Sequence, residues 1–135
     1  VLVGTLLIDR RNPAKAKKSL KIAGERINNG KSVVMFPEGT RTRTGSLQEF
    51  KRGPFVLACL SGVPVVPVVI EGTHTVLPTK TLHIHSGDVA VHILEPILPD
   101  PLQDDSEESL KQAREALLEK VHTAMAQYQL KIRQS

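Results

Sequence analysis

The spacing of hydrophobic residues along the chain predicts alternating strands and helices. Short apolar or β-branched runs, typical of buried strands, cover residues 1–8, 32–36 and 63–70. For the first run, the end of a helix that turns into a strand is the alternative. Between these runs, apolar residues recur at steps of three and four over 13–27, and a second helix is expected over 54–61. We therefore expect an α/β fold with a mixed, largely parallel sheet flanked by helices.

Capping residues mark the ends of the first two helices. Asn12 is a good N-cap, and Pro13 suits the first helical position. The Asn-Asn-Gly run at 28–30 is typical of a left-handed helix end, and Gly62 is expected to end the second helix.

The last third of the chain predicts a hairpin followed by a long amphipathic helix. Two strands, 81–85 and 89–94, flank a Ser-Gly-Asp turn at 86–88. Asp105 and Glu108 are expected to cap the helix. Its apolar stripe, which we interpret as core packing, consists of Leu110, Ala113, Leu117, Val121, Met125 and Tyr128.

The run 63–70 is apolar at almost every position, which is typical of a central strand covered on both faces. Pro64 and Pro67 cannot donate to a neighbouring strand, so we expect an irregular strand or one at an edge where a groove opens. Residues 53–70 carry no charge and are numerous enough to span a membrane. The glycine and prolines within them favour a short helix followed by a strand instead.

Composition and charge restrict the kinds of partner. The 135 residues suggest one domain, and a net charge of +4 suggests an anionic partner: a phosphate, a membrane surface or nucleic acid. Aromatic residues make up only 3% of the chain and tryptophan is absent, which argues against stacking on single-stranded nucleic acid. Cys59, the only cysteine, lies in an apolar run and is interpreted as a buried structural thiol.

Basic residues gather in the first half of the chain, and acidic residues gather late. On the first helix, four lysines lie mostly off the apolar stripe: Lys15, Lys17, Lys18 and Lys21. We interpret them as a solvated face, and contact with anionic lipid head groups is the alternative.

Chemistry-bearing residues follow the strand predicted at 32–36. Glu38, Gly39, Thr40 and Arg41 supply, in that order, an acid, a residue without Cβ, a hydroxyl and a guanidinium. Gly39 lets backbone N–H groups approach a ligand closely, and Arg41 offers a planar fork of donors suited to phosphate. In open α/β sheets, ligands bind where strands end. The segment is therefore a candidate phosphate-binding loop.

The Phe-Pro-Glu-Gly-Thr-Arg run at 36–41 closely resembles the third sequence block of the glycerolipid acyltransferases, which acylate glycerol 3-phosphate and lysophosphatidate. Residues 4–10 (GTLLIDR) resemble the second block of that family, and residues 63–68 (VPVVPV) resemble the fourth. The Phe-Lys-Arg-Gly run at 50–53 fits a Phe-Lys-x-Gly segment that commonly follows the loop. The resemblance covers residues 4–97, with three blocks in the family's order.

The first block of the family, Asn-His-x-x-x-x-Asp, precedes the second and carries the catalytic base. Since this chain begins just before the second block, we expect residues 1–135 to be the C-terminal part of a single acyltransferase domain. The His-Asp block is expected upstream of Val1, so no catalytic residue is expected in this chain. Residues 83–88 also spell His-x-x-x-x-Asp, but they follow the fourth block and lie in the predicted hairpin, so we reject them.

The resemblance also implies roles for individual residues. Those expected to bind substrate are Arg10, Glu38, Gly39, Thr40 and Arg41. Arg41 and Arg10 would bind the acceptor's phosphate, with Arg11 as a rival to Arg10. Glu38 would position the acceptor hydroxyls or pair with an arginine. An acyl or pantetheine groove, with a plain core strand as the alternative, would be lined by Val63, Pro64, Val65, Val66 and Pro67.

The implied activity is transfer of a fatty acyl group from acyl-CoA or acyl-carrier protein to the free hydroxyl of lysophosphatidate. Glycerol 3-phosphate and other lysolipids stay open as acceptors. We expect a membrane-associated protein, at the cytoplasmic face of a bacterial inner membrane, with no cofactor beyond the acyl donor and no nucleic-acid partner. His83 and His85 alternate on one predicted strand but lack a third ligand, so no metal is expected. The alternatives are a non-catalytic relative that binds lysophospholipid or phosphate without the catalytic histidine, and a basic nucleic-acid or anion-binding module.

Overall fold

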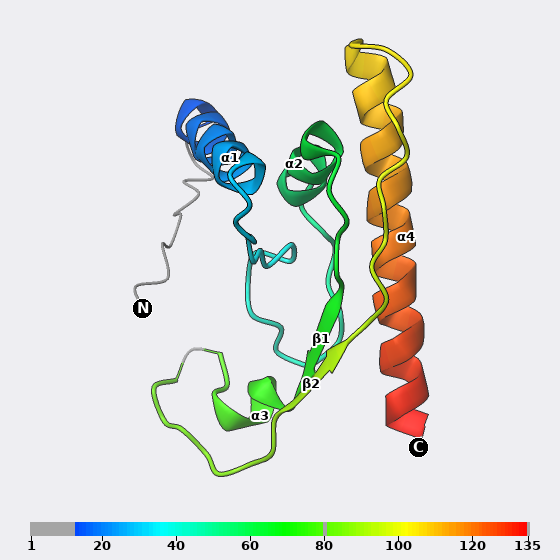
Figure 1. Cartoon of the computed structure of the whole chain (residues 1–135). Coiled ribbons are helices and arrows are strands. Elements are labelled where there is room, and N and C mark those ends of the chain that lie inside the picture. Colours follow the sequence, from blue (N-terminus) through cyan, green and yellow to red (C-terminus); the bar gives the residue numbers. More distant parts are fainter. Residues whose placement is uncertain (1–12, 80, 135) are drawn as a thin grey trace.

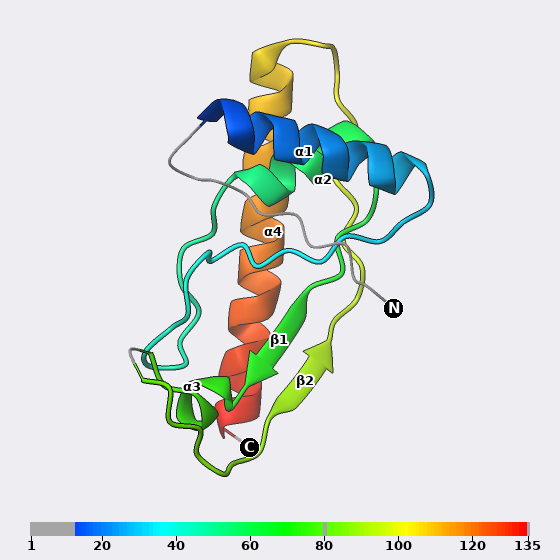
Figure 2. The same cartoon turned by 90° about the vertical axis from the view of Figure 1, so that its left-hand side faces the viewer.

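The computed structural model describes residues 13–79 and 81–134, with side chains described from residue 18 onward. In chain order its elements are α1 (Pro13–Asn28), α2 (Gly53–Ser61), β1 (Val68–Glu71), α3 (Thr73–Val76), β2 (Ala90–Ile93) and α4 (Glu107–Gln134). The long helix α4 runs along one side of the molecule, with α2 and the β1–β2 pair packed against it (Figure 1). In Figure 2, α1 crosses in front of α2, and the two strands lie in front of α4. The expected mixture of helices and strands is therefore found.

The first two helices form where the sequence predicts them. α1 is followed by Gly30 with φ of 74°, a left-handed conformation that glycine adopts without strain. α2 ends at Gly62 in the same way, with φ of 62°. The two helices approach closely, because a Cβ added to Gly24 of α1 would lie 3.6 Å from Leu57 Cδ1 of α2. The strand predicted at 1–8 and the cap predicted at Asn12 lie outside the described residues.

The helix α4 buries its predicted apolar stripe but uses a different cap. The buried side chains of the stripe are Ala113, Leu117, Val121 and Met125, and Leu110 and Tyr128 are half-buried. The predicted Asp105–Glu108 capping pair is wrong, since the N–H of Ser109 donates to Ser106 Oγ at 3.1 Å. Ser106 directly precedes the first helical residue, the position from which a side-chain oxygen reaches the third N–H. Asp105 lies one residue too early to do so.

The hydrophobic core lies between α2, β1 and α4. Its members outside α4 are Phe50, Phe55, Ala58, Cys59 and Val69. The rings of Phe50 and Phe55 stack with centroids 5.8 Å apart, and the ring of His122 meets Phe50 edge-on at 4.8 Å. Burial raises the pKa of the Cys59 thiol, which keeps it protonated and confirms that it is a buried structural thiol.

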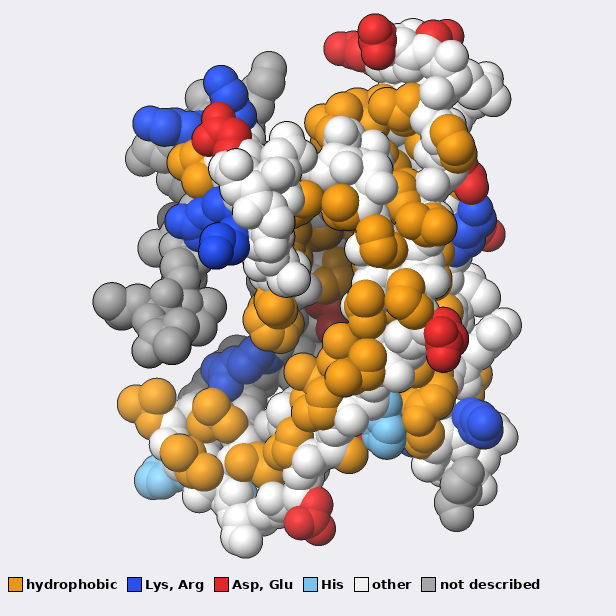
Figure 3. Space-filling model, viewed as in Figure 1, with side chains coloured by type: hydrophobic (Ala, Val, Ile, Leu, Met, Phe, Trp, Pro, Cys, Tyr) orange, Lys and Arg blue, Asp and Glu red, His pale blue; other side chains and the backbone are white. Residues whose placement is uncertain are grey.

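The strands β1 and β2 form an antiparallel pair, with Val69 opposite His92 and Ile70 opposite Val91. On the face toward α4, Val69 is buried, and the Tyr128 hydroxyl lies 3.2 Å from His92 Nδ1. The opposite face, which we call the open sheet face, exposes Val68, Ile70, Val91 and Ile93. Figure 3 shows hydrophobic side chains gathered along the middle of the molecule, over α2 and the strand pair.

The predicted hairpin between 81–85 and 89–94 is wrong. β2 pairs with β1 instead, and 81–85 belongs to an irregular connection between α3 and β2. The reason is packing on α4: β1 is anchored there through buried Val69, and pairing with it places His92 against the same helix. A local hairpin with 81–85 would gain no comparable burial, since the side chain of Leu82 is 96% exposed.

The uncharged run 53–70 forms a nine-residue helix followed by an irregular strand, which confirms the helix–strand interpretation. In the described part of the chain, no helix combines the length and the apolar character that crossing a membrane requires. Between Pro64 and Pro67, Val65 forms only an isolated bridge with Ile97, through two hydrogen bonds of 2.8 Å, so the predicted irregularity is also confirmed. The predicted cover on both faces is wrong, because alternate residues of this strand are exposed.

The strand predicted at 32–36 is not formed. The side chains of Val34 and Phe36 are 84% and 74% exposed, and the segment is irregular. A strand needs a neighbour for its backbone N–H and C=O groups, and the sheet found within 13–79 and 81–134 contains only β1 and β2. The described sheet is thus antiparallel, and the largely parallel arrangement is not seen in it.

Candidate functional site

The candidate loop, residues 37–51, begins with a sharp turn. The N–H of Gly39 donates to the carbonyl of Phe36 at 3.1 Å, and Gly39 has φ of 74°. A residue with a Cβ is strained in this left-handed conformation, so the turn requires glycine. The N–H of Lys51 donates to the carbonyl of Pro37 at 2.8 Å and closes the loop at its base.

Glu38 holds the two limbs of the candidate loop together. Its Oε2 accepts the N–H of Gln48 at 2.9 Å, and Gln48 Nε2 donates to the carbonyl of Thr40 at 3.2 Å. Within the described part of the chain, this carboxylate is therefore bonded to loop backbone rather than to an arginine. Its predicted contact with the acceptor hydroxyls stays a prediction.

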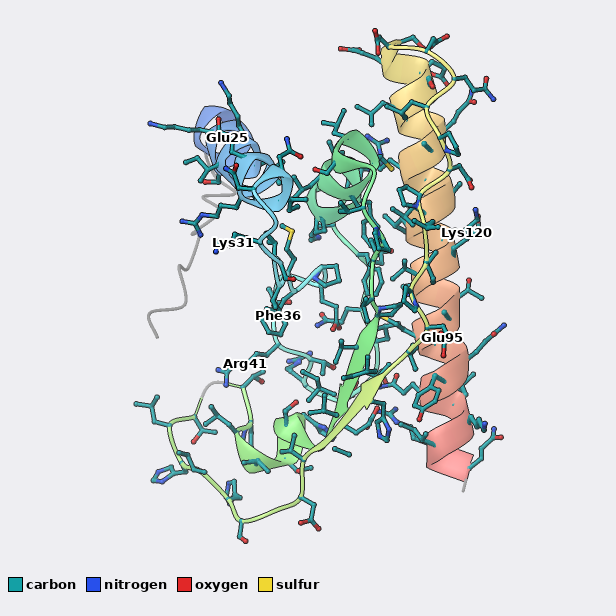
Figure 4. The ribbon with its side chains drawn as sticks, in the orientation of Figure 1. Glu25, Lys31, Phe36, Arg41, Glu95 and Lys120 are labelled. Atoms are coloured by element: carbon teal, nitrogen blue, oxygen red, sulfur yellow. The ribbon has the colours of Figure 1, made fainter. Side chains whose placement is uncertain are left out.

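Arg41 lies at the rim of the candidate loop, on the side of the molecule away from α4 (Figure 4). Its side chain is exposed, and Nη1 donates to the carbonyl of Leu77, just after α3, at 3.3 Å. This long hydrogen bond occupies one of the five N–H donors of the guanidinium. The bond directs the side chain toward α3 and leaves it accessible to an anion from solvent.

The short helix α3 also touches the second limb of the loop. Gly45 bends this limb with φ of 78°, and a Cβ added there would lie 2.6 Å from Cε1 of His74. The imidazole of His74 therefore lies directly against the backbone of Gly45. Together with the Arg41–Leu77 bond, this contact sets α3 along the loop.

Not all residues predicted to bind substrate lie in the described part of the chain. Arg10 lies outside the described residues, so its meeting with Arg41 stays a prediction. Thr40 is exposed beside Arg41, and its carbonyl is bonded to Gln48. Of the cations that follow the loop, Arg52 pairs with Glu115 of α4 at 3.6 Å.

The residues predicted to line an acyl groove alternate between the inside and the outside of the molecule. Val65 packs against the core and Pro67 is buried, while Pro64 and Val66 are exposed and Val63 is half-buried. Two shallow hollows on the surface both lie along α4, and neither is lined by these residues or by the candidate loop. The groove therefore stays a prediction.

The histidines give no second candidate site. His83 and His85 lie in the exposed connection between α3 and β2, and Asp88 lies in the same connection rather than in a hairpin turn. Among the described residues, no group of three His, Cys, Asp or Glu side chains is placed to hold a metal ion.

Two residues that sequence reasoning missed, Gln129 and Arg133 of α4, reach the candidate loop. Gln129 Nε2 and Arg133 Nη2 both donate to the carbonyl of Gly45, at 2.9 and 2.6 Å. Their sequence signal is weak: they are polar residues four apart, beside the apolar stripe on a helix that is polar over most of its surface. Nothing local shows that this side of α4 meets a loop more than 80 residues earlier.

Comparison with known proteins identifies the family to which the chain belongs. A family model described as "Acyltransferase" matches residues 1–71, which is more than half of the chain. The chain belongs to this acyltransferase family, which confirms the resemblance inferred from its three sequence blocks.

Individual relatives narrow the comparison. The chain is 41% identical over 97 residues to the chloroplastic 1-acyl-sn-glycerol-3-phosphate acyltransferase BAT2 of Brassica napus, covering 71% of this chain and 28% of the relative. It is 42% identical over 100 residues to the 1-acyl-sn-glycerol-3-phosphate acyltransferase of Escherichia coli, covering 71% and 39%. Among solved structures, the 1-acyl-sn-glycerophosphate (LPA) acyltransferase PlsC from Thermotoga maritima matches with a TM-score of 0.64 and 34% identity, covering 85% of this chain and 46% of that one. The chain thus spans less than half the length of each of these relatives.

Proposed function

We propose that the full-length protein transfers a fatty acyl group to the free hydroxyl of lysophosphatidate. The observation that carries this proposal is the closed candidate loop, which presents Arg41 at an exposed rim in a chain that belongs to an acyltransferase family. The names of the relatives support lysophosphatidate as the acceptor. Acyl-CoA and acyl-carrier protein both fit as the donor, because each presents the same thioester.

The part of the reaction assigned to this chain is holding the acceptor. A guanidinium can bind two phosphate oxygens through parallel N–H donors, and Arg41 has donors to spare for this. A base outside this chain, the histidine of the expected upstream block, would take the acceptor's hydroxyl proton. The oxygen then attacks the thioester carbonyl, the new C–O bond forms as the C–S bond breaks, and the thiolate leaves and is protonated. The thioester is already activated, so the reaction needs no cofactor besides the donor.

The proposed setting is a membrane surface, at the cytoplasmic face of a bacterial inner membrane. A lysophospholipid and a fatty acyl product both partition into a bilayer, so the enzyme must work where they reside. The net charge of +4 and the exposed arginines Arg41 and Arg43 favour contact with anionic head groups. The same positive charge would also attract nucleic acid, so a specific phosphate site must be distinguished from a general basic surface.

Binding to phosphatidylcholine vesicles that contain lysophosphatidate tests the role of Arg41. Loss of a charge-assisted bidentate contact costs about 1.5–3 kcal/mol, so Arg41→Ala is expected to weaken binding about 10- to 150-fold. Arg43→Ala is the matched control, since Arg43 is an exposed arginine of the same loop and is expected to change binding less than about threefold. Equal losses in both variants, with equal binding to an oligonucleotide, would contradict the phosphate site and favour a general basic surface.

Thiol release from acyl-CoA separates the enzyme from a non-catalytic relative. The full-length protein is expected to release thiol in a lysophosphatidate-dependent way, and residues 1–135 alone are expected to release none. A full-length protein that binds the vesicles but releases no thiol would be a non-catalytic relative that binds lysophospholipid. Turnover by residues 1–135 alone would contradict the assignment of the base to a segment outside this chain.

A further inference from the structure

The last turns of α4 are tied to the candidate loop by polar side chains. The carbonyl Oε1 of Gln129 accepts the N–H of Leu47 at 3.2 Å, and Nε2 of the same amide donates to the carbonyl of Gly45 at 2.9 Å. One side chain thus binds an N–H and a C=O of the same limb, two residues apart. This limb has no regular secondary structure, so such bonds replace the partners that a helix or strand would provide.

Glu71, at the end of β1, completes this anchor. Its carboxylate accepts from Gln129 Nε2, and it accepts from Arg133 Nη2 at 3.2 and 3.3 Å. Arg133 lies one helical turn after Gln129 and also donates to the carbonyl of Gly45 at 2.6 Å. We call Glu71, Gln129 and Arg133 the α4 anchor. It joins three parts of the chain: the end of the sheet, the end of α4 and the candidate loop.

The bonds continue from the α4 anchor to the rim of the loop. Leu47, held by Gln129, is joined by one peptide bond to Gln48. The N–H of Gln48 is held by Glu38, and its side-chain amide holds the carbonyl of Thr40. Arg41 follows Thr40 directly. Each step from α4 to Arg41 is therefore a hydrogen bond or a peptide bond.

A loop without such ties would sample many conformations, and ordering it on binding would cost conformational entropy. A bidentate phosphate contact depends on the placement of the guanidinium to within roughly an ångström. The apolar stripe of α4 accounts for its packing on the core and does not explain why Gln129 and Arg133 face the loop.

We propose that Gln129 and Arg133 are positioning residues that, with Glu71, hold the candidate loop in the conformation that presents Arg41 to the phosphate of the acceptor. In this proposal both residues act through the backbone of the loop, at Gly45 and Leu47, rather than by binding substrate themselves. The inference rests on the proposed function, and it assigns to the C-terminal helix a part in recognising the acceptor.

The test compares Gln129→Ala with Gln127→Ala in the full-length protein. Gln127 is an exposed glutamine of the same helix, two residues away, and it lines a shallow hollow that contains no residue of the loop. Gln129→Ala is expected to raise the KM for lysophosphatidate about tenfold while the KM for acyl-CoA and kcat change less than about twofold. The amides of Leu47 and Gln48 are expected to exchange hydrogen faster in this variant only. A general loss of structure would instead lower kcat and alter both KM values.

Partner exchange provides a rescue. In Gln129→Glu, two carboxylates face each other and the carbonyl of Gly45 loses a donor, so the KM for lysophosphatidate is expected to rise. In the double variant Glu71→Gln with Gln129→Glu, the amide at position 71 can donate to the carboxylate at position 129, which removes the repulsion. The carbonyl of Gly45 keeps only its Arg133 donor, so the KM is expected to fall part of the way back toward the original value. Arg133→Ala, an exposed change near the end of the helix, is expected to act like Gln129→Ala without unfolding the protein.

Unchanged KM values and unchanged exchange in Gln129→Ala would overturn the inference, as would a double variant no better than Gln129→Glu alone. If the unmodified protein does not acylate lysophosphatidate, the proposed function fails. The positioning role is then decided separately, by exchange at Leu47 and Gln48 in Gln129→Ala and Gln127→Ala.

Discussion

Gly39 and Gly30 have the same left-handed φ of 74°, but Gly39 lies in the turn of the candidate loop and Gly30 lies just after a helix. Gly30 follows α1, and a Cβ added there would meet nothing within 4 Å, whereas Gly39 sets the turn that leads to Thr40 and Arg41. An alanine at either position is strained by about 1–2 kcal/mol, so both variants are expected to lower the free energy of unfolding by similar amounts. Only Gly39→Ala is expected to weaken binding to lysophosphatidate-containing vesicles, because its turn must shift to relieve the strain. Urea unfolding and vesicle binding of both variants give the two measurements, and equal binding would mean that the turn does not position Arg41.

The helix α4 begins with a cap from Ser106, rather than from the Asp105–Glu108 pair that its sequence pattern predicts. Ser106→Ala removes the oxygen that accepts the N–H of Ser109 and is expected to lower the free energy of unfolding by about 1 kcal/mol. Ser106→Asp keeps an acceptor at the N-cap and places a negative charge at the helix start, so it is expected to preserve stability. Thermal and urea unfolding check both variants, and a fully stable Ser106→Ala would show that the bond contributes nothing.

The elements also show which parts of the fold can be predicted from sequence. Helices depend on contacts three and four residues apart, so the extent of α1, the glycine end of α2 and the stripe of α4 could be predicted from their own residues. Strand pairing is not local: β2 pairs with β1 across the whole connection that contains α3, because β1 is already packed on α4. The loop residues could be found because glycine, acid and arginine have distinct chemistry. Gln129 could not be found, since a polar residue on a helix looks the same whether it faces solvent or a loop.

At the scale of the whole molecule, the strand pair is covered on one face only. On the open sheet face, Val68 lies opposite Ile93 and Ile70 opposite Val91, so four apolar side chains form one continuous surface. Val34 and Phe36 add further exposed apolar area from the segment before the candidate loop. Single exposed apolar residues are ordinary, but soluble proteins rarely expose a large contiguous patch. The chain spans less than half the length of its relatives, and within the described residues no element covers this face.

The open sheet face predicts that residues 1–135, prepared alone, bind an environment-sensitive apolar dye. Replacing Val91 and Ile93 together by threonine keeps β-branched side chains, and so strand propensity, while it removes the apolar surface that β2 contributes to the patch. We expect dye fluorescence to fall by about half or more, with helix content by circular dichroism unchanged, because the long helix α4 packs on the other face of the strand pair. Leu82→Thr is the control, since Leu82 is 96% exposed on the connection between α3 and β2 and stands apart from the strand pair. If that variant lowered the fluorescence as much as the double variant, the dye would be reporting scattered apolar side chains, and the open sheet face would not act as one surface.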